Sequence, residues 1–323
     1  MRYLIFAFLF VLLTNCGLLD SSNDNSIVAF SAKNDSGIQI FTIDFSSPEI
    51  SMKQFTNNDF RSTDPIFSHD KKYIIYSGND DLALDNPTVM IINSNIGKSN
   101  RLTFSNGQDA VLVGRPFYYD PYQNRLIIGI NGHYIPPFIA SYDFQTKTGN
   151  NITSGLNAST HAIGILPPDT ILSSAILYNE SGWEYGVYKV NNDGELCGKL
   201  PNPHMKYINH DGIMIYHMGN TRYYHENGLF LFDLLSPELE GRKIAVTNWD
   251  GTYFEILTTG DFNDIKPVYG PDQKYIIFER REDGDNNGDS SKLMYIKLSD
   301  KSINILIDSD MYPGYSMFSS PAF

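Results

Sequence analysis

The chain has 323 residues, enough for two average domains or one large all-β domain. Its 24 Lys and Arg are outnumbered by 37 Asp and Glu, which gives a formal net charge of -13. A chain this acidic repels phosphate backbones, so no nucleic-acid partner is expected. The 21 Tyr and 20 Phe suit stacked β-sheets, and they favour an all-β protein with an aromatic core.

The first residues have the pattern of an export signal. Arg2 precedes an apolar run at 3–13, which is too short for a membrane span, because a spanning helix takes about 20 residues. The Leu-Thr-Asn-Cys tail that ends at Cys16 resembles a bacterial lipobox, in which the leader is removed and the cysteine is acylated. We therefore expect residues 1–15 to be a signal peptide, Cys16 to be lipidated and residues 16–26 to be a polar tether. An ordinary secretory leader, in which Cys16 has no role, is the alternative.

The chain contains only one further cysteine, Cys197. With Cys16 lipidated, it has no intrachain partner, so no structural disulfide is expected. It lies in the strand-like run Glu-Leu-Cys-Gly-Lys-Leu, which predicts a small core residue rather than a nucleophile.

A ten-residue pattern recurs along the chain. Its clearest copies are residues 67–76 (Phe-Ser-His-Asp-Lys-Lys-Tyr-Ile-Ile-Tyr) and 269–278 (Tyr-Gly-Pro-Asp-Gln-Lys-Tyr-Ile-Ile-Phe). Each copy predicts an aromatic strand end, a tight turn and an apolar strand, because an Asp carboxylate can accept hydrogen bonds from N–H groups just downstream. The predicted turn residues of the successive units are Asp70, Asp120, Asp169, Asn227 and Asp272.

Each unit is predicted to contain four strands, A to D, and the unit repeats about every 50 residues. The chain begins with strands of types B, C and D at 27–31, 39–45 and 51–55, and it ends with an A strand at 320–323. Joining the two ends completes a sixth sheet and leaves no bare edge between them. We therefore predict an all-β, six-bladed β-propeller of four-stranded antiparallel sheets over residues 27–323, closed by the C-terminal strand in the N-terminal blade.

Two further details follow from the repeat. Residues 202–219, ahead of the fifth unit, are predicted to be an extra loop or strand pair. The equivalent positions in the six A strands are predicted to be Pro65, Pro116, Pro167, Arg222, Pro267 and Pro321.

The recurring pattern resembles the repeat of TolB-like, or PD40, propellers, which are related to WD40 propellers. That repeat reads roughly Pro-x-Trp-Ser-Pro-Asp-Gly-Lys-x-Ile-x-Phe, and residues 269–278 and 67–76 match it best. The resemblance extends over residues 27–323 and implies a propeller fold for that stretch. TolB itself carries an N-terminal α/β domain ahead of its propeller, whereas the tether alone precedes the propeller here.

A search for reactive motifs finds no nucleophile elbow and no Walker or Rossmann glycine pattern, so no enzymatic activity is expected. The strongest candidate is 283–289, which matches the first half of a calcium loop through Asp283, Asp285, Asn287 and Asp289. Met294 replaces the bidentate Glu of such loops, so we favour a solvated hairpin and keep calcium as the alternative. No other cofactor is expected.

These features predict a non-catalytic, lipid-anchored TolB-like propeller that is monomeric and binds a protein or peptide partner in the bacterial cell envelope. The lipid would hold it at the inner or the outer membrane. A glycan-binding or glycan-cleaving propeller is the second hypothesis, because the tyrosines of 118–119 and 223–224 have rings suited to stacking on sugars. A calcium-stabilised structural propeller is the third.

Overall fold

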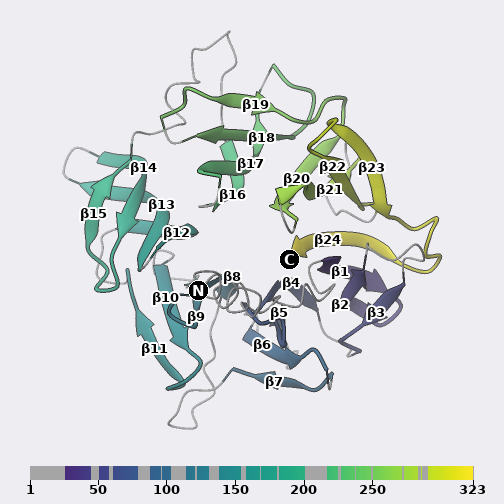
Figure 1. The fold of residues 1–323 in the computed structure, drawn as a ribbon, viewed down its shortest axis with the longest axis horizontal. Coiled ribbons are helices and arrows are strands. Elements are labelled where there is room, and N and C mark those ends of the chain that lie inside the picture. The colour runs from purple at the N-terminus through teal and green to yellow at the C-terminus, as the bar shows by residue number, and fades with distance from the viewer. Residues whose placement is uncertain are drawn as a thin grey trace, which may run out of the picture.

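Six four-stranded sheets are arranged around one axis (Figure 1). The structure, a computed structural model, describes residues 26–322 except for 45–50, 58–60, 79–87, 96, 103–113, 121, 131–137, 154–157, 168, 180–181, 201–216, 225–226, 237, 249, 271–272, 283–284 and 286–289. Within these residues every strand pair is antiparallel, so the predicted all-β six-bladed propeller is confirmed.

The strands follow the predicted units. Blade 1 contains β24 (Ser316–Ala322), β1 (Ile27–Asn34), β2 (Gly37–Asp44) and β3 (Met52–Gln54). Blade 2 contains β4 (Ser62–Phe67), β5 (Tyr73–Gly78), β6 (Thr88–Asn93) and β7 (Ser99–Arg101). Blade 3 contains β8 (Gly114–Asp120), β9 (Arg125–Ile130), β10 (Phe138–Asp143) and β11 (Thr148–Asn151). Blade 4 contains β12 (Ala158–Leu166), β13 (Thr170–Asn179), β14 (Gly182–Val190) and β15 (Leu196–Lys199). Blade 5 contains β16 (His217–Tyr224), β17 (Leu229–Leu235), β18 (Lys243–Asn248) and β19 (Phe254–Ile256). Blade 6 contains β20 (Asn263–Tyr269), β21 (Tyr275–Arg281), β22 (Lys292–Lys297) and β23 (Ser302–Ile307).

The ring is closed as predicted, because β24 is the innermost strand of blade 1. Ala322 lies opposite Ala29, and Ser319 lies opposite Ser31. In Figure 1 the yellow β24 lies beside the purple β1, although the two strands come from opposite ends of the sequence.

The core consists of six hydrophobic clusters, one between each pair of neighbouring blades. In β17, Phe230 and Phe232 pack against blade 4, whereas Leu231 packs against blade 6. Successive side chains of a strand point to opposite faces, so a strand covered on both faces must be apolar throughout. This explains the uninterrupted apolar runs of the repeat.

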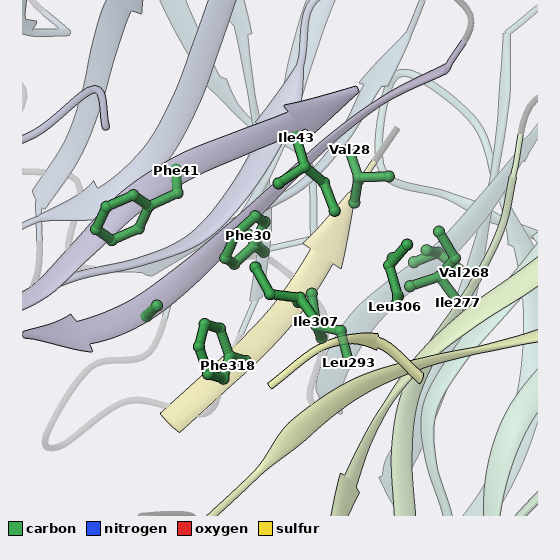
Figure 2. Packing of buried hydrophobic residues seen from close by; sticks show 11 residues of the cluster. Val28, Phe30, Phe41, Ile43, Val268, Ile277, Leu293, Leu306, Ile307 and Phe318 are labelled. Atoms are coloured by element: carbon green, nitrogen blue, oxygen red, sulfur yellow. The ribbon is translucent and has the colours of Figure 1, made fainter. Parts of the chain in front are cut away.

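The cluster between blades 6 and 1 holds the closing strand in place. Figure 2 shows Phe318 of β24 packed next to Phe30 of β1 and next to Leu293 and Ile307 of blade 6. The rings of Phe30 and Phe318 have centroids 6.2 Å apart, and both side chains are fully buried.

The pairing register corrects three of the six equivalent positions. To align the blades, we take the third residue of the second strand in each blade and find its partner in the innermost strand. That partner is Ile66 in blade 2, Tyr118 in blade 3, Gly164 in blade 4 and Arg222 in blade 5. The positions equivalent to Pro65, Pro267 and Pro321 are therefore Phe117, Ile163 and Thr221, not Pro116, Pro167 and Arg222. Irregularities of different length in the innermost strands shift the alignment, which the sequence spacing did not reveal.

Two further predictions are wrong. Cys197 is exposed rather than in the core, because β15 is the outermost strand of blade 4 and has a neighbour on one side only. Residues 217–219, predicted to belong to the extra segment, are part of β16. The rest of that segment, 202–216, lies outside the described residues.

The two ends of the propeller differ in their connections. Because strands alternate in direction, the connections β5–β6 and β7–β8 leave one end of blade 2, and β4–β5 and β6–β7 leave the other. The longest connections, 102–113 and 200–216, join strands at the first end, which we call the long-loop end. Turns such as 68–72 and 94–98 lie at the second, the short-turn end. In the described part of the chain, no helix has the length and apolar character to cross a bilayer.

Candidate functional site

The predicted turn residues serve the backbone of their own turns. The carboxylate of Asp70 accepts hydrogen bonds from the Lys72 N–H at 3.2 Å and from Ser68 Oγ at 2.8 Å. Ser68 Oγ in turn accepts the Tyr73 N–H at 3.0 Å. Burial raises the pKa of Asp70, but the hydrogen bonds from Lys72 and Ser68 outweigh it and leave the pKa below its ordinary value.

Blades 3 and 5 use the same chemistry at the corresponding positions. Asp120 Oδ1 accepts the Tyr122 N–H at 3.0 Å, and its other oxygen accepts Arg125 Nε at 2.9 Å. Asn227 Oδ1 accepts the Leu229 N–H at 3.0 Å. Asp169 lies exposed in the β12–β13 turn, and Asp272 lies outside the described residues. The turns between third and fourth strands, which the sequence reading passed over, are held in the same way by Asn93, Asp143, Asn191, Asp250 and Asp300.

Replacing Asp70 with Ala is expected to lower the free energy of unfolding by about 1 kcal/mol, because the turn loses its acceptor. Asp70→Asn is the matched control, since its Oδ1 still accepts from the Lys72 N–H. The depressed pKa means that the carboxylate stabilises the fold above the ordinary Asp pKa and that this contribution disappears as the pH falls. Urea unfolding at neutral and at acidic pH measures both effects; an Ala variant as stable as the parent at neutral pH would contradict the assignment.

Of the calcium-loop candidates, the structure describes only Asp285. Its Oδ2 accepts the Ser290 N–H at 2.9 Å and Ser290 Oγ at 2.7 Å, as expected in a hairpin. Asp283, Asn287 and Asp289 lie outside the described residues. Elsewhere in the described chain, no group of three His, Cys, Asp or Glu side chains is placed to hold a metal ion.

Three of the four tyrosines considered for sugar stacking bridge neighbouring blades, and the fourth, Tyr119, donates a hydrogen bond to Asn124 of its own blade. The Tyr118 hydroxyl donates to the carbonyl of Ile163 in blade 4 at 2.6 Å, and burial raises the pKa of Tyr118. The Tyr224 hydroxyl accepts the Tyr269 N–H of blade 6 at 3.1 Å. Tyr223 is buried between blades 4 and 5. Their packing therefore accounts for these rings without a ligand.

A different set of polar residues lies on the innermost strands of four blades. These residues have positive φ although none is glycine, and they occupy the equivalent bulge position: Asp64 (52°), Asn220 (45°), Lys266 (53°) and Ser320 (53°). Such backbone costs on the order of 1 kcal/mol or more per residue and is concentrated at functional sites. We call this set the axial network, together with the side chains that they contact and the two arginines, Arg242 and Arg281, that pair with the contacted carboxylates Asp233 and Glu279.

On one side, the axial network joins the closing strand to both of its neighbours. Lys266 Nζ donates to Ser319 Oγ at 2.7 Å and to Ser320 Oγ at 2.9 Å. Ser319 Oγ donates to Glu279 of blade 6 at 2.5 Å, and Ser320 Oγ donates to Asp64 of blade 2 at 2.9 Å. Two consecutive serines of β24 are thus fastened to blades 6 and 2 at once.

On the other side, the network continues into blade 5. The carboxylate of Asp233 accepts Asn220 Nδ2 at 2.6 Å, Arg242 Nη1 at 2.7 Å and the Lys266 N–H at 3.3 Å. Lys266 therefore belongs to both halves, through its backbone to Asp233 and through its ammonium to Glu279, which lies 3.3 Å away.

The charges of the axial network are layered. The Asp233 and Glu279 side chains are 0% exposed, whereas Arg242, Lys266 and Arg281 are 32%, 25% and 20% exposed. Solvent therefore reaches the cations, while the carboxylates beneath them hold these cations in place. A general acid or base must reach the substrate. Buried, hydrogen-bonded carboxylates suit a fixed recognition surface better than proton transfer.

The network lies toward the long-loop end, because Asp233 and Glu279 occur in the second halves of β17 and β21, which end there. Lys243 fixes two connections at the same end. Its Nζ donates to the carbonyls of Phe262 at 2.9 Å, of Arg242 at 3.3 Å and of Glu240. Burial lowers the pKa of Lys243, and the nearby Asp264 opposes that shift.

The sequence analysis did not identify the axial network. A signal was present, because Asp64, Lys266 and Ser320 each directly precede a proline of the A strands. The two-residue bulge changes the direction in which the side chain before the proline points. A strict alternation of inward and outward side chains does not predict this change.

Comparison with known proteins supports the fold alone. No family model matches the chain, and no curated protein sequence matches it. Among solved structures it resembles TolB from Acinetobacter baumannii (TM-score 0.63, 14% identity, 92% of this chain and 66% of that one). It also resembles a TolB from Agrobacterium tumefaciens (0.59, 12%, 87% and 88%) and the hydrazine synthase of Kuenenia stuttgartiensis (0.61, 16%, 92% and 46%). The chain thus spans just under two thirds of the first structure and under half of the third.

These findings define the protein first as a six-bladed β-propeller. Its particular fold is TolB-like, as the repeat pattern implied. Because TolB and an enzyme, hydrazine synthase, have similar folds, the fold by itself assigns no chemistry.

Proposed function

We propose that this chain is a lipid-anchored, non-catalytic propeller that binds a protein or peptide partner in the bacterial cell envelope through its long-loop end. The observation that carries the binding role is the axial network, a set of partly exposed cations held rigidly over buried carboxylates. Preorganised groups lose little freedom on association, so their binding energy is used efficiently.

The lipid anchor is the part of the proposal that rests on the sequence of the first sixteen residues. Cys16→Ala is expected to abolish incorporation of labelled palmitate, because the acylated sulfur is removed. The matched control is Cys197→Ser, which should leave incorporation unchanged, since Cys197 lies on the outer strand of blade 4. Incorporation that survives Cys16→Ala would contradict the anchor.

The binding role is tested by photo-cross-linking in intact cells. One cross-linking residue replaces Arg61, which is exposed at the start of β4 at the long-loop end, and the other replaces Asn95, which is exposed at the short-turn end. A discrete adduct from position 61 that is absent from position 95 supports the proposal. Turnover of a glycan or peptide by the purified protein would contradict the non-catalytic role.

A further inference from the structure

The chain enters the propeller at the short-turn end. β1 begins at Ile27, which lies opposite Asp44 at the end of β2. Ser26 Oγ donates to Asp44 Oδ1 at 2.6 Å, so the first described residue is tied to that end. Because β1 is the second strand of its blade, it starts at the level of the 68–72 turn. A lipid on Cys16 therefore pulls on this end of the molecule.

Four lysines lie at the same end, on blades 1 and 2. Lys71 and Lys72 lie in one turn of blade 2, and Lys98 lies in the other. Ser94 joins the two turns, since its N–H donates to the Lys72 carbonyl at 2.8 Å and its Oγ donates to the Lys71 carbonyl at 2.9 Å.

The fourth, Lys53, lies on blade 1. Lys53 Nζ lies 4.6 Å from the ring centre of Phe55, and Lys71 Nζ lies 5.7 Å from that of Phe67. Both rings belong to the hydrophobic cluster between blades 1 and 2. We call Lys53, Lys71, Lys72 and Lys98 the lysine cluster.

The short-turn end is electrically asymmetric. Among the described residues near the lysine cluster, the acidic groups are Asp44 and Asp70, and Asp70 lies 3.0 Å from Lys72. The described residues in the corresponding turns of blades 4 and 5 include no Lys or Arg, and the acidic residues among them are Asp169, Asp193, Glu195 and Asp250. Blade 5 lies across the ring from blade 2 (Figure 1). Blade 6, next to blade 5, adds Lys274, Lys297 and Lys301 at this end, but Lys297 lies 3.6 Å from Asp300 and Lys301 pairs with Glu255 of blade 5. The acidic part of this end is therefore centred on blades 4 and 5, on the far side of the ring from blade 2.

We propose that the short-turn end faces the membrane and that the lysine cluster contacts the anionic phosphates of lipid headgroups. Blade 2 is then tilted toward the bilayer and blade 5 away from it. This inference rests on the proposed lipid anchor, which supplies the attachment that the lysine cluster orients. It leaves the long-loop end, with the axial network, directed away from the membrane and toward a partner.

Electrostatic magnitudes support this orientation despite the acidic net charge. Each Lys close to an anionic leaflet strengthens membrane association about fivefold. Charges further than a Debye length of about 10 Å at 0.1 M salt are largely screened. The leaflet therefore attracts the nearby lysine cluster more strongly than it repels the distant acidic residues. Ten residues of chain reach at most about 36 Å, which keeps the attached end near the bilayer.

The test uses the lipidated protein reconstituted in phosphatidylcholine vesicles, with or without phosphatidylglycerol, and a headgroup-linked quencher. Single cysteines for a fluorophore are placed, in a Cys197→Ser background, at Asn95 (blade 2, short-turn end), Thr252 (blade 5, short-turn end) and Ser36 (long-loop end). All three positions are exposed. We expect quenching to decrease in the order Asn95, Thr252, Ser36 when phosphatidylglycerol is present.

Charge reversal separates tilt from attachment. In Lys71→Glu, Lys72→Glu, Lys98→Glu protein, the difference between Asn95 and Thr252 is expected to be lost, as it is without phosphatidylglycerol, while Ser36 stays least quenched. Equal quenching at Ser36 and Asn95 in palmitate-labelled protein would overturn the orientation alone. Absence of palmitate at Cys16 would overturn the anchor and this inference with it. A tilt that persists after charge reversal would overturn the role of the lysine cluster.

Discussion

Ending the chain at Tyr315, and so removing β24, is expected to abolish cooperative unfolding. The deletion removes the innermost strand of blade 1 and exposes the edge of β1. It also removes Phe318, which is fully buried against Phe30, and the serines that fasten blades 6 and 2. Loss of a buried Phe side chain alone costs about 3–5 kcal/mol, against a total stability of about 5–15 kcal/mol for a typical domain.

The measurement is thermal and urea unfolding followed by circular dichroism, with binding of a hydrophobic dye as a second readout. Phe318→Ala in the full chain is the graded comparison and should retain a cooperative transition at lower urea concentration. Ile305→Ala is the matched control, because Ile305 lies in β23 of the adjoining blade and is 48% exposed. A truncated chain that unfolds at the parent's urea concentration would show that ring closure contributes nothing to stability.

The sequence predicted ring closure because the strands at the two ends of the chain add up to one complete four-stranded blade. Blade 1 lacked its A strand at the start of the chain, and a strand without partners remained at the end. Strands such as β5 and β21 could be recognised from their apolar runs, because neighbouring blades cover each of them on both faces. These features depend on composition and order along the chain, which a single sequence contains.

The candidate site could not be predicted from the sequence in the same way. Asp233 of β17 and Glu279 of β21 meet Lys266 of β20 only after blades 5 and 6 have formed and packed together. The bulges at Lys266 and Asp64 also disturb the alternation from which side-chain direction is predicted. The burial of Cys197 was mispredicted for a related reason, because an outermost strand and a buried strand can have similar amino-acid sequences. The local sequence does not say how many neighbours a strand has.

Replacing Glu279 with Ala is the second change with a large expected effect, a loss of about 3 kcal/mol in the free energy of unfolding. The Glu279 carboxylate is 0% exposed and accepts from Arg281 Nε at 2.6 Å and from Ser319 Oγ at 2.5 Å, with Lys266 Nζ 3.3 Å away. Its removal leaves two cations close together with no carboxylate between them, in a region only partly open to water. That uncompensated charge, rather than the lost hydrogen bonds alone, sets the size of the effect.

A double substitution distinguishes this cause from simple loss of packing. Glu279→Leu with Lys266→Met removes a buried charge together with one of its partners, and replacing a buried pair with apolar residues is often close to neutral. We therefore expect the double variant to be more stable than Glu279→Ala when both are unfolded in urea. Lys297→Ala is the matched control, because its ion pair with Asp300 is 3.6 Å long and about half exposed, and such pairs contribute about 0–1 kcal/mol.

The same variants connect stability with binding. If the axial network recognises the partner, Lys266→Met should reduce the adduct formed at position 61 by more than its effect on unfolding explains, since an exposed cation of the recognition surface is removed. Lys297→Ala should leave that adduct unchanged, because Lys297 lies at the short-turn end. An adduct that is equally strong in Lys266→Met protein would assign the axial network to ring closure alone and place partner recognition on the long connections.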